Sequence, residues 1–296
     1  MHEYLLELEQ VYYTYTGANK NALNGLTLKI PTGKKCALIG QNGCGKTTLF
    51  LLANGLYKPN QGSVIWQGKP IQYNRKSLMQ LRQQVGLIFQ DPEQQLVAST
   101  VEEDISYGLC NLNLPELEIK TRVEQALEEF DLIELAQTPV HHMSLGQKKR
   151  VSIADVMVLQ PQLLLLDEPT AYLDKLHSRK LITTLKNIHQ NGTTVLMASH
   201  DLDLIYRWAD WLFVMDSGLL ILEGEPKQVF NQRNIIESLD LEVPLIHDIL
   251  SILETQQRKN LRKIKISNIQ IYPLRHPQKN YLKCDTIERS FLGTNV

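Results

Sequence analysis

The sequence of 296 residues predicts an α/β fold with a mostly parallel sheet, and three observations support this prediction. Short apolar runs alternate along the chain with segments of helical spacing, as in strand–helix units. Two of the runs, 163–166 and 194–197, do not alternate in polarity, which is expected of strands buried on both faces of a parallel sheet. The third observation is the pattern G-x-x-x-x-G-K-[ST] at 40–47, which lies between an apolar run and a helix-like run.

The expected strands begin near the N-terminus. A segment at 5–15 contains four residues that favour strands, Val11, Tyr12, Tyr13 and Tyr15. Further strands are expected at 26–30, 35–39, 63–66, 85–89, 163–166, 193–198, 211–215 and 219–222.

Helices are expected between these strands. Apolar residues recur at helical spacing in 121–130 and in the segment after Asp174. Thr100 and Glu103 have the spacing of a capping box. The stretch 91–159 combines strong helix signals with little strand character, so we expect a helical insertion there.

Composition restricts the class of protein. The chain is 43% hydrophobic and 21% charged, which is typical of a globular protein, and its formal net charge of −1 gives no overall field that favours nucleic acid. Its four cysteines form no C-x-x-C pair, which favours a reducing compartment. The sequence shows no secretory or membrane-spanning segment, so a role at a membrane would depend on a partner.

We expect three regions along the chain: a main domain at 1–232, a helical extension at 233–255 and a basic tail at 256–296. The tail carries nine Lys/Arg and two Asp/Glu, a net charge of +7, which leaves −8 for residues 1–255. We expect the tail to lack fixed structure, and the alternative is a contact with acidic lipid or with a partner.

The pattern at 40–47 predicts a site for a nucleoside triphosphate. Its glycines let the backbone curl so that successive N–H groups point at phosphate oxygens, and the helix that begins near Lys46 adds the positive end of its dipole. Lys46 supplies charge for the terminal phosphates, and Thr47 offers a hydroxyl to magnesium. The residues expected to hold ATP here are Gly40, Gln41, Asn42, Gly43, Cys44, Gly45, Lys46, Thr47 and Thr48.

A second motif, which is acidic, follows the apolar run at 163–166. Asp167 and Glu168 end this run, and the carboxyl ends of parallel strands form the edge of an α/β sheet where ligands bind. Asp167 can hold magnesium, and Glu168 can polarise the water that attacks the γ-phosphate. A third motif, Ser144-Leu145-Gly146-Gln147, is compatible with an anion-receptive helix start, but by itself it is more typical of an ordinary helix cap.

Taken in order, these motifs resemble those of the ATP-binding cassette (ABC) ATPases over residues 5–230. The phrases at 89–96, 100–104, 147–151 and 199–204 resemble the energy-coupling-factor, cobalt/nickel-type transport ATPases. The resemblance implies an ATPase that binds ATP and Mg²⁺. It also implies a P-loop fold with an antiparallel β subdomain and an inserted helical subdomain at about 91–159.

The resemblance also implies roles for single residues. Tyr15 would stack on the adenine, with Tyr13 as the nearby alternative. Gln90 would touch magnesium or the attacking water, and His200 would contact the γ-phosphate and orient Glu168. Residues implied to take part in catalysis are Lys46, Gln90, Glu168 and His200, and those implied to hold magnesium are Thr47, Gln90 and Asp167.

Other residues would act across a dimer. Ser144 and Gly146, followed by Gln147, would contact ATP held by a second subunit, and Asp174 would cross the interface. This sequence departs from the family pattern at Leu145, where glycine is usual, and at Tyr172, where a small residue is usual. These departures raise the alternative of a regulatory subunit with low turnover.

The expected function is that of an ATP-hydrolysing subunit on the cytoplasmic face of a membrane, where it powers import of a transition-metal ion or a vitamin. Its partners would be a second ATPase subunit, identical or a close paralogue, and integral membrane subunits, with no nucleic acid. Import of another small solute is one alternative. An ABC ATPase that acts on ribosomes or DNA is a further one, which the single loop motif and the lack of a heptad run disfavour.

Overall fold

The structure is a computed structural model that describes residues 2–112 and 114–253. The chain divides into two compact units, 1–251 and 252–296, and the description below concerns the first. The expected basic tail at 256–296 lies outside the described residues. The limits proposed for the three regions of the chain stay a prediction.

A mostly parallel sheet lies at the centre of the fold. Its strand order is β10-β9-β3-β8-β7-β6. Neighbouring strands from β6 to β9 are parallel, and β10 pairs antiparallel with β9. The strands are β3 (Lys35–Ile39), β6 (Val85–Ile88), β7 (Leu163–Asp167), β8 (Thr194–Ala198), β9 (Trp211–Asp216) and β10 (Leu219–Gly224).

The continuous apolar sequence of the central strands has a direct explanation in their burial. Every residue of β7 is buried, and its side chains alternate between two cores. Leu163 and Leu165 pack on the side of the sheet that carries the first helix, α1 (Lys46–Ala53). Leu164 and Leu166 join the core on the opposite face. Both faces therefore require apolar side chains, and the alternation typical of a half-exposed strand is lost.

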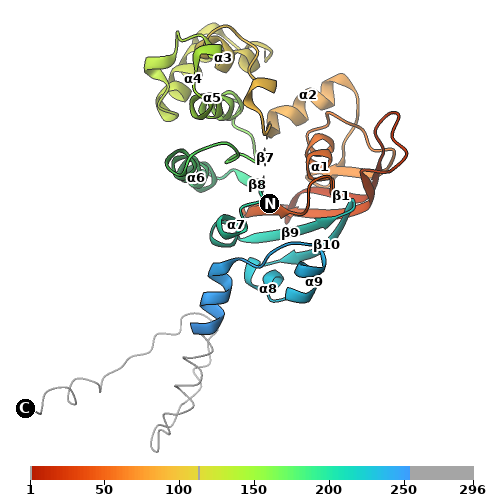
Figure 1. Ribbon diagram of the computed structural model, residues 1–296. Coiled ribbons are helices and arrows are strands. Elements are labelled where there is room, and N and C mark those ends of the chain that lie inside the picture. Colours follow the sequence, from red (N-terminus) through yellow and green to blue (C-terminus); the bar gives the residue numbers. More distant parts are fainter. Residues whose placement is uncertain (1, 113, 254–296) are drawn as a thin grey trace, which may run out of the picture. The chain divides into compact units, whose positions relative to one another are not determined.

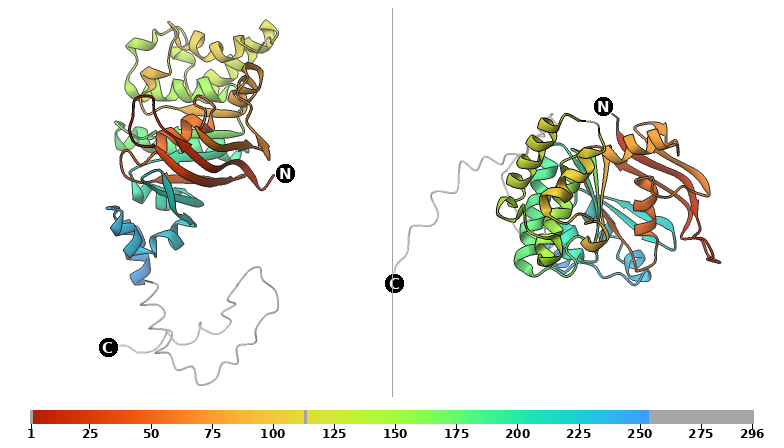
Figure 2. Two further views of the ribbon diagram at one scale, coloured as in Figure 1. Left: turned by 90° about the vertical axis from the view of Figure 1, so that its right-hand side faces the viewer. Right: turned by 90° about the horizontal axis from the view of Figure 1, so that it is seen from above.

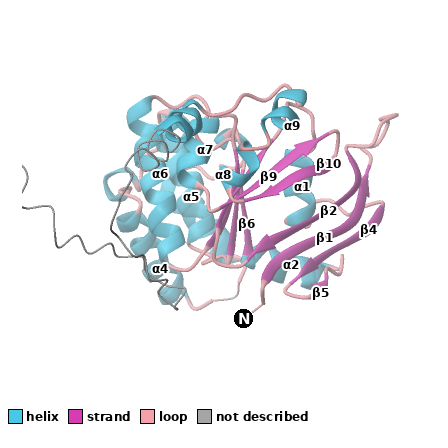
Figure 3. Ribbon diagram, turned by 90° about the horizontal axis from the view of Figure 1, so that it is seen from below, coloured by secondary structure: helices cyan, strands magenta, loops and turns pink. Residues whose placement is uncertain are grey.

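A second sheet is antiparallel throughout. Its order is β2-β1-β4-β5. The strands are β1 (Tyr4–Tyr13), β2 (Leu23–Pro31), β4 (Gln61–Trp66) and β5 (Lys69–Pro70). Helix α1 lies between the two sheets (Figure 3), and its Leu49 and Phe50 are wholly buried.

Some of the remaining helices cover the parallel sheet, and those between Pro92 and Met157 form a separate group. Between Pro92 and Met157 the described residues contain helices and one isolated bridge, Thr100 to Pro139, and Figure 2 shows these helices grouped apart from the strands. The longer helices are α2 (Arg75–Gln84), α3 (Val101–Cys110), α4 (Glu116–Glu129), α5 (Leu145–Met157), α6 (Lys175–Gln190), α7 (Leu202–Trp208), α8 (Pro226–Phe230) and α9 (Arg233–Ser238). Short 3-10 turns occur at η1 (Pro92–Gln94), η2 (Ile133–Leu135) and η3 (Val140–His142).

The strand expected at 5–15 extends too far at its C-terminal end. Strand β1 stops at Tyr13, because the N–H of Thr14 donates to the side chain of Asn60 at 2.6 Å instead of continuing the ladder. Tyr15 then lies in a turn closed by the N–H of Ala18 at 3.0 Å. The capping box at Thr100 is present as predicted.

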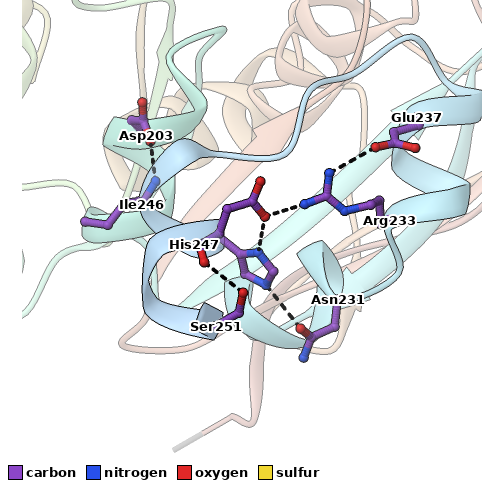
Figure 4. Close-up of polar contacts among 8 residues, drawn as sticks. Asp203, Asn231, Arg233, Glu237, Ile246, His247 and Ser251 are labelled. Atoms are coloured by element: carbon purple, nitrogen blue, oxygen red, sulfur yellow. Dashed lines mark hydrogen bonds and ion pairs between the residues drawn. The ribbon is translucent and has the colours of Figure 1, made fainter. Parts of the chain in front are cut away.

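A polar cluster fixes residues 245–251, the first part of the last described helical segment (245–253), to the preceding helices (Figure 4). The ring of His247 is buried, and its Nε2 lies 3.1 Å from Oδ1 of Asn231. Arg233 forms an ion pair with Asp248 of the same segment. The end of this compact unit is therefore held by side chains as well as by packing.

Candidate active site

The phosphate-binding loop connects β3 to α1, the helix that Figure 1 labels near the upper end of β1. Gly40 has φ 154° and Gly45 has φ 109°, conformations that other residues rarely adopt. A Cβ on Gly40 would lie 2.2 Å from the carbonyl oxygen of Met215, and one on Gly45 would lie 2.8 Å from that of Ala22. At both positions glycine is therefore required by conformation and by space.

Lys46 begins α1 and is largely buried within the loop. Its Nζ donates hydrogen bonds to the carbonyl oxygens of Gly40 at 2.7 Å and Gln41 at 3.0 Å. These bonds hold a positive charge at the loop. Burial raises the pKa of the neighbouring Cys44 thiol, which disfavours the thiolate and agrees with a small residue that is tolerated here without redox chemistry.

Oxygen ligands for magnesium converge beside the loop. The hydroxyl of Thr47 donates to Oδ2 of Asp167 at 2.5 Å, although the two residues come from α1 and β7. Gln90 follows β6 and lines the same cavity. Hydroxyl, carboxylate and amide oxygens are the donors that Mg²⁺ prefers, so this donor set fits the ion.

Glu168 lies next to this donor set in a strained backbone conformation, with φ 44°. The backbone N–H of His200 donates to its Oε2 at 3.3 Å, and Nε2 of the His200 ring lies 3.3 Å from Oε1. Burial raises the pKa of Glu168 to about 7, and burial followed by the charge of Lys46 lowers the pKa of His200. A carboxylate with a pKa near neutrality is suited to accept a proton.

These groups border one cavity of about 520 Å³. Tyr15 also lines it, and the Tyr15 hydroxyl lies 2.9 Å from Oγ1 of Thr48. Tyr13 does not line it and packs behind Tyr15, with ring centroids 5.1 Å apart. Of the two tyrosines that the sequence left open, the structure brings Tyr15 to the cavity, and its stacking on adenine stays a prediction.

The residues expected to act across a dimer lie outside this cavity. Ser144 caps α5 through a capping box, in which its N–H donates to Oε1 of Gln147 at 2.8 Å. A Cβ on Gly146 would lie 3.0 Å from the ring of His177, and Asp174, the cap of α6, lies 2.9 Å from Nδ1 of the same ring. The starts of α5 and α6 are therefore neighbours.

Sequence reasoning missed Lys149. Lys149 belongs to the run of basic residues at 148–150, which resembles a solvated stretch, yet Lys149 is 1% exposed. Its Nζ donates to the carbonyl oxygen of Phe89 at 3.2 Å and to that of Gln90. Burial lowers its pKa to about 8, against the opposing effect of nearby carboxylates. The available signal was position, because Lys149 lies one turn before the buried Ile153.

A second missed contact joins the loop to the far end of the compact unit. Nε2 of the Gln41 side chain donates to the carbonyl oxygen of Leu239 at 3.1 Å. The loop is thus supported by a residue that follows α9.

A phosphate loop between β3 and α1, with two carboxylates at the end of β7 beside it, defines a P-loop nucleoside triphosphatase. A family model described as ABC transporter matches residues 23–171. A putative ABC transporter ATP-binding protein of Nostoc sp. is 69% identical over 249 residues, which cover 84% of this chain and 91% of the relative. An energy-coupling factor transporter ATP-binding protein, EcfA2, of Clostridium perfringens is 41% identical over 86% of this chain and 89% of its own. The chain belongs to the ABC transporter ATP-binding family and is an ATPase.

The solved structures agree. CbiO1 of Clostridium perfringens, described as part of the ABC transporter complex CbiONQ, matches with a TM-score of 0.71 at 40% identity and covers 84% of this chain and 99% of its own. The fold class and the resemblance to energy-coupling-factor ATPases are thus confirmed. Within residues 2–112 and 114–253, no helix has the length and apolar character needed to cross a bilayer.

Proposed function

We propose that this ATPase powers a membrane importer of the energy-coupling-factor type, whose cargo is a transition-metal ion or a vitamin. The observation that carries the proposal is the meeting of Thr47, Asp167, Glu168 and His200 around one cavity at the phosphate loop. The relatives named as energy-coupling factor ATPases and the likeness to CbiO1 support the type of importer. The nearest alternative is that the ATPase powers an importer of another small solute.

The polar residues at the phosphate end of the cavity have defined tasks in this proposal. The loop N–H groups and Lys46 bind the phosphates. Thr47, Asp167 and Gln90 would hold Mg²⁺, which when bound neutralises phosphate charge. Glu168 accepts a proton from the attacking water, and His200 orients the Glu168 carboxylate and contacts the γ-phosphate.

The proposed assembly contains two ATPase subunits and integral membrane subunits, on the cytoplasmic face of the membrane. Ser144, Gly146, Gln147 and Asp174 are outside the cavity of their own chain and are half-exposed or exposed. This placement supports a composite site in which they contact ATP held by the other subunit. An identical subunit and a close paralogue fit equally well.

Glu168→Gln tests the proposal. Glutamine keeps an acceptor for the N–H of His200 but is a very weak base, so we expect ATP binding to persist while turnover falls at least about a hundredfold. The variant should accumulate as an ATP-dependent dimer in size-exclusion chromatography. Glu128→Gln, on the exposed face of α4, is the matched control. Wild-type turnover in Glu168→Gln would show that another group takes the proton.

A regulatory subunit with low turnover is the second candidate. It is favoured by Tyr172, which borders the cavity, is 78% exposed and has φ 62°. The assembled transporter separates the two functions. Replacement of Tyr172 by alanine should raise turnover several-fold if the ring limits closure, and should leave it unchanged if the chain is a fully active ATPase.

A further inference from the structure

One face of α5 is joined to the segment 89–98 by several polar contacts. This segment follows β6, contains η1 and begins beside the cavity. The contacts are Lys149 Nζ to the carbonyl oxygens of Phe89 and Gln90, Lys148 Nζ to Glu93, and Gln95 Nε2 to the carbonyl oxygen of Ser152 and to Asp155. The set runs along two turns of α5, so the helix and the segment are held in one register.

Among these contacts, those of Lys149 reach the active site. The two carbonyl groups that it binds are consecutive, and the second belongs to Gln90. Two consecutive carbonyls held by one ammonium fix the direction of the backbone at Gln90. They thereby fix the position of the Cα that carries the Gln90 side chain. The ammonium of a lysine that is 1% exposed depends on such acceptors, because an unpaired buried charge is strongly unfavourable.

Lys149 is also close to the start of its helix. Ser144 caps α5 five residues earlier, which corresponds to about 7.5 Å along a helix. A helix of this length moves as a rigid body, so a shift at Ser144 is passed to the carbonyl of Gln90 without an intervening hinge.

We propose that Lys149 is a positioning residue, which ties Gln90 to the Ser144 end of α5 so that the two move together. This inference rests on the proposed function, in which Ser144 contacts the ATP of a second subunit and Gln90 contacts magnesium or water in its own. Contact made at one nucleotide is then transmitted to the catalytic set at the other.

Lys148 provides a matched control on the same helix. Its ammonium pairs with the carboxylate of Glu93, whose side chain is 66% exposed, and it bonds to no carbonyl of Phe89 or Gln90 among the contacts described. The substitutions Lys149→Met and Lys148→Met remove the same group from neighbouring positions and keep a similar volume. Lys149→Arg keeps donors for both carbonyls.

The first readout is structural and needs no nucleotide. Hydrogen exchange of residues 89–95 in nucleotide-free protein should accelerate about tenfold in Lys149→Met, because charge-assisted hydrogen bonds are lost, and by less than about twofold in Lys148→Met. Unchanged exchange in Lys149→Met would overturn the inference, and it would do so whether or not the proposed function holds.

The second readout is kinetic. In Lys149→Met we expect kcat to fall about tenfold or more while the KM for ATP changes by less than about threefold, because the residue acts on the catalytic geometry rather than on ATP contacts. Lys149→Arg should recover kcat to within about threefold of wild type. An equal loss in Lys148→Met, or a loss confined to KM, would refute the positioning role. If wild type itself shows no turnover while Lys149→Met accelerates exchange, the proposed function fails and the structural link stands.

Discussion

The partly buried carboxylate of Glu168 should make the stability of the nucleotide-free protein depend on pH. Burial raises its pKa from 4.5 to about 7, so the folded protein holds a proton that the unfolded chain releases. Stability is therefore lost as pH rises from about 4.5 to about 7, and it stays reduced above that range. Glu168→Gln has no charge to bury, so the variant should be more stable than wild type at high pH and equal to it at low pH.

The size of the effect follows from the same shift. A change from 4.5 to about 7 corresponds to about 3 kcal/mol for a fully enclosed group. The side chain is 12% exposed and borders a solvent-filled cavity, which screens its charge, so we expect about 1–2 kcal/mol. For a domain of this size, that difference raises Tm by about 2–8 °C.

Thermal and urea unfolding at pH 5 and pH 8.5, with EDTA and without nucleotide, measure this difference. EDTA is essential, because a bound cation beside Asp167 would itself stabilise the carboxylate. Glu128→Gln, on the exposed face of α4, controls for the loss of one negative charge and should change stability by less than about 0.5 kcal/mol at either pH. An advantage of Glu168→Gln that is the same at both pH values, or that reverses at pH 8.5, would refute the reasoning.

Three further predictions concern the phosphate-binding loop, the adenine contact and the last helical segment. Gly40→Ala should destabilise the fold by about 3 kcal/mol or more in urea unfolding, because the new Cβ meets a backbone oxygen. In the control Gly33→Ala, which has open space at its Cβ, we expect mainly backbone strain of about 1 kcal/mol. Equal effects of the two substitutions would contradict the clash. Tyr15→Ala should weaken ATP binding about 10-fold but leave inorganic triphosphate binding unchanged in calorimetry, and a larger loss in Tyr13→Ala would reassign the stacking residue. His247→Ala should reduce stability by about 1–3 kcal/mol and speed exchange at 245–251 before any other region, and uniform exchange would show that the polar cluster has no local role.

Much of the fold followed from local patterns in the sequence. The run Leu163–Leu166 predicted a doubly buried strand, and β7 is such a strand. Helix α2 was not anticipated, because its segment is strongly polar and buries Leu81 alone among its residues. Its start was marked by Asn74, whose side chain accepts from the N–H of Ser77, a signal that a propensity reading of apolar spacing does not include.

The site was predictable where one motif carries the chemistry, as at Lys46 and Thr47. The contacts that join separate motifs were not. The burial of Lys149 depends on carbonyl groups of Phe89 and Gln90, which carry no side-chain signature. The bond from Gln41 to Leu239 likewise uses a backbone acceptor far along the chain. Backbone acceptors are present at every residue, so the sequence does not indicate which of them a side chain will reach.

The position of β3 in its sheet has a consequence for biosynthesis. Cys36 of this strand lies opposite Leu196 of β8 and Trp211 of β9, both of which are synthesised much later. At about 5–20 residues per second, the strand waits about 9–35 s for its second neighbour. A nascent chain that ends before Trp211 contains the whole phosphate-loop motif, yet it lacks one of the two strands that flank β3. The first half of the chain should thus need protection from aggregation until translation is nearly complete.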